Sequence, residues 1–470
     1  MAGKTTIRDK GMAARIVAVS VCLMALAIHG QAEVNVWSSS LDMQDRLDPK
    51  PAIALKKDRS GKADAIVIDL SRTRQSVLGI GSSLEHSTCY NLSQLDPATR
   101  GEAIERLLDP EKGIGMNLMR ICIGTSDFTG DPWYSYNDLP EGQTDPNMEH
   151  FSIEKDRDYL LPILKAAQAT NPDLLFFASP WSPPAWMKDS GRLCGGKLLP
   201  QHHNAYARYL ARFIRAYEAE GIPIHAITIQ NEPGVNVATY PSCAWTGDVQ
   251  RDFIKNSLGP LFASEGIKTL IWCFDHNFNN VAFPQAILRD ADAAKFVDGT
   301  AFHLYEGKPE AMGALAREFP DKHVYFTEGS TYNLGGAIQI MNYFANGARS
   351  YNAWVTIIDK QGKPNNGPHH CSPTCIVFDP GAKTITYRFD YYMYGHFSKF
   401  VKRGARVVET VRGDPRFSHI AFLNPDGTVV LVVANNTREK RKFGVRCQGQ
   451  AFQSELPAQS MATYVWSPSR

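Results

Sequence analysis

Eight short apolar runs, alternating with amphipathic stretches of helical length, constrain the fold of this 470-residue chain most strongly. Each run has the length and composition of a buried strand. They are residues 76–81, 117–123, 174–178, 226–229, 269–274, 299–303, 323–326 and 354–358. Strands that alternate with helices form a parallel sheet. Eight such units predict a (β/α)₈ TIM barrel over residues 77–399.

The stretches between the runs carry the helical pattern. In residues 206–218, large apolar side chains recur every three or four positions, which buries one face of a helix. Residues 156–169 and 248–265 behave similarly. The alternative is a doubly wound open sheet, but no G-x-G-x-x-G turn follows the first run. The pattern therefore favours the barrel.

The two ends of the chain differ from the middle. Residues 65–70 read as a strand within residues 33–76, and residues 56–61 as polar turn material. After residue 400, short strands are expected at 407–411, 419–423, 428–433, 443–445 and 462–466. Several short strands with turn signals are typical of a sandwich. We therefore expect residues 33–76 and 400–470 to form one side β-sandwich.

Residues 1–32 have the pattern of a secretory signal peptide. Four basic residues precede an apolar run at 16–28. The small residues Gly30 and Ala32 then occupy the two positions that a signal peptidase reads, and cleavage is expected after Ala32. A membrane anchor is the alternative, but the 13-residue run is short for spanning a bilayer. The sequence thus predicts a secreted or periplasmic protein, with no stable membrane insertion after cleavage.

The net charge limits the classes of partner, and the positions of the cysteines suggest which are thiols and which could form a disulfide. The chain has a net charge of +2 and residues 1–32 carry +3, so the remainder carries −1. This gives no reason to expect nucleic acid as a partner. Cys122 and Cys273 lie inside apolar runs and are expected to be buried thiols. Cys371 and Cys375 are candidates for a disulfide, although the sequence does not fix the pairing.

Two glutamates follow strand runs at equivalent places. Glu232 follows the fourth run after Gln230 and Asn231, and Pro233 then prevents the strand from continuing. Glu328 follows the seventh run. Active sites of barrels lie at the carboxyl ends of the strands. Strands four and seven lie across the ring from each other, so both carboxylates are expected to face one cleft.

Two carboxylates across a cleft can cleave a glycosidic bond. At a spacing of ~5 Å, Glu328 would attack the anomeric carbon while Glu232 protonates the leaving oxygen, which is a retaining double displacement. Arg120, near the end of the second run, is expected to keep Glu328 ionised. A barrel that binds carbohydrate without cleaving it is the alternative from another class.

The other residues at the strand ends suit a sugar. Aromatic faces stack on pyranose C–H surfaces, while carboxylates and amides take hydroxyls. His303 is expected to orient a carboxylate rather than to react. The remaining candidates for substrate contact are Asp127, Trp181, Asn231, Tyr305 and Trp354.

Metal and cofactor chemistry have weaker support. His369, His370, Cys371 and Cys375 resemble a ligand cluster, which leaves a metal-dependent hydrolase as a further alternative. Their spacing matches no standard zinc site. The chain also lacks the H-E-x-x-H, phosphate-loop and G-x-S-x-G patterns. We therefore expect neither a metal nor a cofactor.

With these motifs in place, the chain resembles glycoside hydrolase family 30, especially the branch with the acid β-glucosidase that cleaves glucosylceramide. The resemblance spans most of residues 33–470. The matching stretches are residues 113–120, 126–128, 178–186, 231–233, 250–254, 297–299, 303 with 305, 327–328 and 395–400.

The resemblance implies a barrel with a side sandwich and a retaining mechanism. It implies that Glu232 is the acid/base and Glu328 the nucleophile. Sugar contact is implied for Asp127, Trp181, Asn231 and Trp354. The shell around the nucleophile is implied to be Arg120, His303 and Tyr305.

Three stretches depart from the family around the substrate mouth: residues 79–86, 352–354 and 363–378. They leave the chemistry intact and affect the choice of sugar and aglycone. The resemblance favours a terminal β-glucoside or glucosylceramide as substrate. The alternatives are an endo-β-1,6-glucanase or a xylosidase, fucosidase or glucuronidase of the same family. The expected partner is thus a carbohydrate or a glycolipid.

Overall fold

The computed structural model describes residues 3, 33–58, 65–370, 374–411 and 413–468. The chain divides into one unit of residues 1–31 and a second of residues 32–470, and the account below concerns the second. Apart from Gly3, the predicted signal peptide lies outside the described residues. Within the described part of the chain, no helix combines the length and the apolarity needed to cross a membrane.

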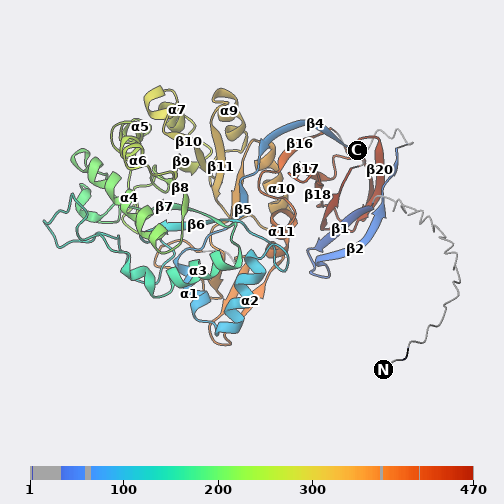
Figure 1. The fold of residues 1–470 in the computed structure, drawn as a ribbon, viewed down its shortest axis with the longest axis horizontal. Coiled ribbons are helices and arrows are strands. Elements are labelled where there is room, and N and C mark those ends of the chain that lie inside the picture. The colour runs from blue at the N-terminus through green and yellow to red at the C-terminus, as the bar shows by residue number, and fades with distance from the viewer. Residues whose placement is uncertain (1–2, 4–32, 59–64, 371–373, 412, 469–470) are drawn as a thin grey trace. The chain divides into compact units, whose positions relative to one another are not determined.

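Eight parallel strands confirm the predicted (β/α)₈ barrel (Figure 1). Strands β6 to β11 form one sheet in chain order, and β12 pairs with β5. Isolated bridges from Ser83 to Arg120 and from Val324 to Ala348 join the two sheets and close the ring. The strands are β5 (Gly79–Gly81), β6 (Leu118–Ile123), β7 (Leu175–Pro180), β8 (Ile224–Thr228), β9 (Leu270–Asn277), β10 (Val297–His303), β11 (His323–Glu328) and β12 (Ser350–Asn352).

The predicted position of the eighth strand was wrong. Residues 354–358 do not form it; β12 does, four residues earlier. The sequence pattern does not indicate this strand because two of its three side chains are polar; both form hydrogen bonds inside the barrel. Ser350 Oγ donates to Phe326 O, and Asn352 Nδ2 donates to Leu118 O at 2.7 Å. The expected run instead contributes to a separate three-stranded sheet of β13 (Ile357–Asp359), β14 (Ile376–Asp379) and β15 (Thr384–Tyr387).

Helices cover the outside of the barrel (Figure 1). The predicted helix at 206–218 lies within α4, whose buried face includes Tyr209, Phe213 and Tyr217. The predicted helix at 248–265 is α5, a π turn η4 (Ile254–Leu258) and α6. The α-helices are α1 (His86–Ser93), α2 (Pro97–Leu108), α3 (Leu160–Thr170), α4 (His203–Ala219), α5 (Gly247–Phe253), α6 (Gly259–Glu265), α7 (Ala282–Leu288), α8 (Ala291–Ala294), α9 (Glu310–Glu318), α10 (Asn333–Ala345) and α11 (Phe389–Ser398). The 3₁₀ turns are η1 (Glu154–Arg157), η2 (Ala185–Met187) and η3 (Pro200–His202).

The sandwich combines strands from both ends of the described chain, as predicted (Figure 1). Ten strands follow the order β2-β1-β21-β18-β17-β16-β4-β19-β20-β3 around a separate apolar core. Two expectations were incomplete: Lys56–Lys57 form β3 rather than a turn, and β20 was missed. The strands are β1 (Glu33–Ser40), β2 (Arg46–Ala54), β3 (Lys56–Lys57), β4 (Ile66–Ser76), β16 (Arg406–Val411), β17 (Ser418–Leu423), β18 (Val429–Asn435), β19 (Arg441–Cys447), β20 (Gln450–Leu456) and β21 (Ser460–Trp466).

A buried histidine joins the barrel to the sandwich. His396 on α11 contacts Ser39 Oγ of β1 through Nε2 at 2.9 Å and Thr463 Oγ1 of β21 through Nδ1 at 2.8 Å. Thr463 Oγ1 also donates to the His396 carbonyl. Burial lowers the pKa of His396 to about 3, so the ring is neutral at ordinary pH.

Candidate active site

The two glutamates lie at the same rim of the barrel, as expected from their place after strand runs. Glu328 is the last residue of β11. Glu232 follows β8 by four residues and has a φ of +48°, a left-handed conformation that non-glycine residues rarely adopt. Its N–H donates to Asp275 O at 3.0 Å, which holds the turn. Such strained backbone is concentrated at functional sites.

One imidazole nitrogen lies between the two carboxylates. Nδ1 of His303 is 3.3 Å from Glu232 Oε1 and 3.8 Å from Glu328 Oε1. The two carboxylate oxygens are therefore at most about 7 Å apart, a limit that includes the spacing of ~5 Å typical of retaining glycosidases. The predicted pair of facing carboxylates thus exists in the structure.

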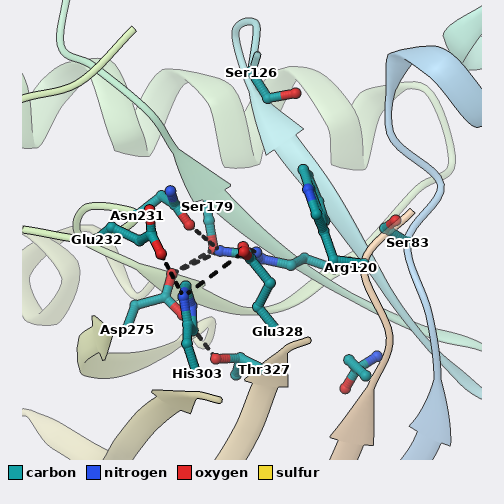
Figure 2. A network of polar contacts seen from close by, with 12 residues as sticks. Ser83, Arg120, Ser126, Ser179, Asn231, Glu232, Asp275, His303, Thr327 and Glu328 are labelled. Atoms are coloured by element: carbon teal, nitrogen blue, oxygen red, sulfur yellow. Dashed lines mark hydrogen bonds and ion pairs between the residues drawn. The ribbon is translucent and has the colours of Figure 1, made fainter. Parts of the chain in front are cut away.

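Arg120 of β6 lies beneath Glu328 and is fully buried. Its Nη1 donates to Glu328 Oε2, and its Nη2 donates to Asn231 Oδ1 at 2.8 Å and to Asp275 Oδ2 at 2.9 Å (Figure 2). Its Nε reaches Ser179 Oγ at 3.2 Å. A buried guanidinium needs such partners, because an unpaired charge away from water is costly. Arg120 therefore fixes both the charge and the orientation of Glu328.

Asp275 is the centre of this network, and the sequence did not single it out as a site residue. It is buried and accepts hydrogen bonds from Arg120 and from Nε2 of His303 at 2.9 Å. Three hydroxyls from other strands of the barrel also donate to it. They belong to Ser179, Thr228 and Thr327.

A β-bulge places Asp275 there. Along β9, Phe274 pairs with Ala301 and His276 with Phe302, so Asp275 is the extra residue of the strand. Phe274 and Asp275 both have positive φ, +73° and +72°. Bulges re-aim side chains next to active sites. The only signal in the sequence was that Asp275 stands near the end of the fifth run.

The charges of the network shift several pKa values. Burial disfavours the charge on Asp275, but Arg120 and His303 outweigh burial and hold its pKa well below the usual range. Burial also opposes the charge on His303, yet Glu328 and Asp275 raise its pKa to about 9. The hydrogen bond from His303 lowers the pKa of Glu232 despite burial. At neutral pH, the pair of Glu232 and His303 thus holds one proton, mainly on the imidazole.

Aromatic side chains form one wall of the site. Trp181 and Trp354 stack with ring centroids 5.0 Å apart, and the guanidinium of Arg120 lies 4.9 Å from the Trp181 ring centroid. Tyr305, half-exposed, donates its hydroxyl to Glu328 Oε1 at 2.8 Å. Flat rings beside carboxylates are typical of sugar-binding sites.

Asp127 is a carboxylate in an unfavourable place for charge. Burial, together with the charges of Glu328 and Glu232, raises its pKa to about 8. It is therefore largely protonated at neutral pH and able to donate a hydrogen bond. Its carbonyl accepts the N–H groups of Asn366 and Gly367, so the loop that departs from the family pattern packs against it.

A cavity of about 880 Å³ collects most of the predicted site. Seven of the nine predicted residues line it, while Arg120 and His303 lie beneath its floor. The predicted residues in its wall are Asp127, Trp181, Asn231, Glu232, Tyr305, Glu328 and Trp354. His369 and His370 line the same cavity, in keeping with the expected place of residues 363–378 around the substrate mouth, whereas Tyr240 in its wall was not predicted.

Within the described residues, one group of side chains has the spacing of metal ligands: Glu232, His276 and His303, whose ligand atoms lie within 4.8 Å of one another. The histidine–cysteine cluster does not form such a group there. Cys371 lies outside the described residues, and so does any bond between Cys371 and Cys375. Cys122 and Cys273 are buried and free, as predicted. The expectation that the chain needs no metal and no cofactor stays a prediction.

Comparison with known proteins gives matches over both domains. Residues 77–401 match the family model described as the glycosyl hydrolase family 30 TIM-barrel domain. Residues 404–464 match the glycosyl hydrolase family 30 beta sandwich domain.

Two curated relatives carry different activities in their names. An endo-1,6-beta-D-glucanase, BGN16.3 of Trichoderma harzianum, is 31% identical over 421 residues, which cover 83% of this chain and 84% of the relative. The lysosomal acid glucosylceramidase of Mus musculus is 29% identical over 447 residues, which cover 88% and 85%. Among solved structures, the endo-beta1,6-glucanase BT3312 matches with a TM-score of 0.85 and 29% identity, over 93% of this chain and 99% of that one.

Proposed function

The chain belongs to glycosyl hydrolase family 30 and is a glycoside hydrolase, and from this we propose that it cleaves β-glucosidic bonds with retention of configuration. One observation carries the proposal. Glu232 and Glu328 share a cavity, and a single nitrogen of His303 lies within 3.8 Å of an oxygen of each. The upper limit of about 7 Å between the two oxygens allows the ~5 Å spacing at which one carboxylate can form a covalent intermediate.

In the first step, Glu328 attacks the anomeric carbon and forms a glycosyl ester. Arg120 and Tyr305 donate to its two oxygens, which orients the carboxylate and stabilises its charge. The C–O bond to the leaving group breaks, and the leaving oxygen takes a proton from Glu232. His303, at 3.3 Å, supplies that proton to Glu232.

In the second step, a water molecule attacks the glycosyl ester. Glu232 now accepts a proton from the water, and the ester bond to Glu328 breaks to regenerate the carboxylate. Esterified Glu328 carries no charge, so it no longer favours a proton on the nearby pair of His303 and Glu232. Glu232 can therefore stay deprotonated and act as the base. The same residue thus serves as acid and then as base.

The sugar at the cleavage point is placed by the aromatic wall and Asp127. Trp181 and Trp354 offer apolar surface, while Asp127 and Asn231 offer hydrogen bonds to hydroxyls. We propose β-glucose for this position. Its support is the similarity to β-1,6-glucanases and a glucosylceramidase, whose names all specify glucose.

β-1,6-Glucan is the substrate that we place first. Besides apolar residues such as Val235 and Leu304, the rest of the cavity lining includes several amides and imidazoles, which can bond to the hydroxyls of further sugar units. These polar residues are His276, Asn277, Asn279, Asn280, His369 and His370. Glucosylceramide is the second candidate, on the similarity to the mouse enzyme over 88% of this chain.

The deciding experiment combines substrate choice with stereochemistry. Soluble β-1,6-glucan, glucosylceramide in detergent micelles and aryl β-glucosides are offered to the full chain. Proton NMR then records the anomer formed first. Initial release of the β-anomer supports the proposal, and initial release of the α-anomer contradicts it. The size of the glucan products separates internal from terminal cleavage.

We further propose that the protein is exported and that residues 1–32 are removed. The support is the basic and apolar pattern of that segment. Sequencing the N-terminus of the protein recovered from culture medium or periplasm tests this. A start at Glu33 agrees with the proposal. Intact protein that starts at Met1 and stays in the cytoplasmic fraction contradicts it.

A further inference from the structure

A second cavity, of about 580 Å³, lies beside the catalytic one and shares no residue with it. Residues from α1, from the turn at 130–131 and from the hairpin of β14 and β15 border it. Tyr159 and Asp359 add to its wall, and the rest comes from the loop that departs from the family pattern. Residues 363–366 of this loop line the second cavity, and residues 369–370 line the catalytic one.

This dividing loop is fixed to the catalytic site. Asn366 and Gly367 donate their N–H groups to Asp127 O, both at 3.1 Å. Asn366 Nδ2 also donates to Asp131 O at 2.8 Å. A Cβ on Gly367 would lie 2.5 Å from that of Asp127, so the backbone approaches too closely for any other residue. The two cavities are therefore separated by one ordered segment of chain.

An exposed aromatic ring lines the second cavity. Large apolar side chains are exposed at four described positions: Tyr90, Val249, Tyr305 and Val411. The two aromatic ones each line a cavity, Tyr305 the catalytic one and Tyr90 the second. Tyr90 is 40% exposed. An exposed ring in a polar hollow offers a surface on which a sugar can stack.

Neighbouring side chains orient this ring. Tyr159 packs edge-on against Tyr90, with ring centroids 5.7 Å apart and an angle of 83°. The hydroxyl of Tyr159 donates to Asp131 Oδ2 at 2.8 Å, which fixes Tyr159 in turn. The stacking surface is thus set before a ligand arrives, which reduces the entropy lost on binding.

The charges of the lining favour a neutral ligand. The lining holds two carboxylates, Asp131 and Asp359, and two ammonium groups, Lys363 and Lys383. A phosphate or another anion would meet both signs at once, whereas hydroxyl groups can bond to either. The amides of Gln94 and Asn366 add further donors and acceptors.

We propose that this cavity is a second carbohydrate site, which holds a stretch of the β-glucan chain away from the cleavage point. The inference rests on the proposed function for the identity of the polymer. Tyr90 stacks on one glucose unit, and the mixed polar groups bind its hydroxyls. Binding here keeps the polymer on the enzyme between successive cleavages.

Affinity electrophoresis through gels containing soluble β-1,6-glucan tests the proposal without turnover. The full chain carries Glu328→Gln in every sample, so the polymer stays intact. We expect Tyr90→Ala to weaken binding about tenfold, as truncation of a stacking aromatic does. Tyr90→Phe keeps the ring and is expected to keep the binding. The matched control is Val249→Ala, another exposed large side chain, which lies on α5 outside both cavities.

Equal retardation of Tyr90→Ala and Val249→Ala overturns the second site, and so does a migration of the parent Glu328→Gln protein that the glucan does not slow. The result also separates this inference from the proposed function. Binding that depends on Tyr90, in an enzyme that hydrolyses no β-glucoside, supports the second site and contradicts the catalytic proposal. Hydrolysis of a β-glucoside by an enzyme whose glucan binding does not depend on Tyr90 supports the catalytic proposal and contradicts the second site.

Discussion

Nε2 of His303 contacts Oδ1 of Asp275 at 2.9 Å, and both side chains are completely buried. The contact fixes the ring so that its other nitrogen points at Glu232. A carboxylate behind a histidine sets the orientation of the ring and stabilises its protonated form. Asp275 therefore acts on the reaction through His303 and Arg120, as a positioning residue.

Asp275→Asn is expected to lower kcat at least tenfold and to destabilise the fold by about 3 kcal/mol, because it leaves buried positive charge without its partner. Enzyme kinetics and urea unfolding measure the two effects. The matched control is Asp298→Asn, whose carboxylate bonds Tyr325 near the start of β10, away from the catalytic rim. An Asp275→Asn enzyme with wild-type kcat contradicts the positioning role.

Glu328→Gln is expected to reduce kcat/KM at least ~10³-fold, because an amide cannot form the glycosyl ester. Initial rates on the best substrate of the panel measure the loss. Glu310→Gln makes the same change on the exposed first turn of α9 and should leave the rate unaltered. Activity of Glu328→Gln within tenfold of wild type removes Glu328 as nucleophile.

Glu232→Gln is expected to discriminate between leaving groups. An alkyl glucoside needs protonation and should lose ~10²–10⁴-fold in rate, whereas a dinitrophenyl glucoside, which leaves without a proton, should lose much less in the first step. Added azide should then react with the trapped glycosyl ester to give a β-glucosyl azide, identified by NMR. Equal losses on both substrates argue against an acid role for Glu232.

The pH dependence of kcat/KM should show an alkaline limb near pH 9. The pKa of His303 is about 9, so above this pH the pair of His303 and Glu232 loses the proton that the leaving group needs. We expect activity on an alkyl glucoside to fall as the pH rises through this value. The dinitrophenyl glucoside needs no acid, so its profile should lack the limb. Identical limbs for both substrates contradict the assignment.

His396 should make stability depend on pH. Its pKa is about 3 in the fold and ~6.5 when unfolded, so below pH 6.5 the unfolded chain binds a proton that the folded chain does not. Stability contributed by the neutral ring is complete above pH 6.5 and falls by ~1.4 kcal/mol per pH unit below it. Urea unfolding at pH 7 and pH 5 should differ by about 2 kcal/mol more for wild type than for His396→Gln.

His150→Gln, at an exposed site, is the control for that measurement and should keep the wild-type difference. The same difference in His396→Gln as in wild type would show that the pH dependence arises elsewhere. Because His396 contacts both β1 and β21, the experiment also reports on the junction of barrel and sandwich.

The sequence predicted the parts of the site that depend on strand ends. Glu232 and Glu328 stand after apolar runs of strand length, and barrel topology then brings them to one rim. It failed for β12, whose serine and asparagine look like loop residues but satisfy carbonyl groups inside the barrel. Strand β20 was missed because its sequence, QAFQSEL, is largely polar.

The central role of Asp275 depends on backbone geometry that composition does not encode. Two consecutive non-glycine residues with positive φ are rare, and no residue preference marks them in advance. The second cavity is a similar case. Tyr90, Asp131 and Lys383 come from three distant segments that only the folded chain brings together.

The pairing of β1 with β21 sets an order of events during synthesis. Strand β1 leaves the ribosome first among the described strands, and its partner leaves last. The whole barrel is synthesised in between, so β1 and its neighbour β2 can join the ten-stranded sheet through β21 only after nearly the entire chain has been made. Closing so long a loop is slow. A nascent chain released early would therefore leave the edge of β1 that pairs with β21 exposed, and such an edge is a site for chaperones or for aggregation.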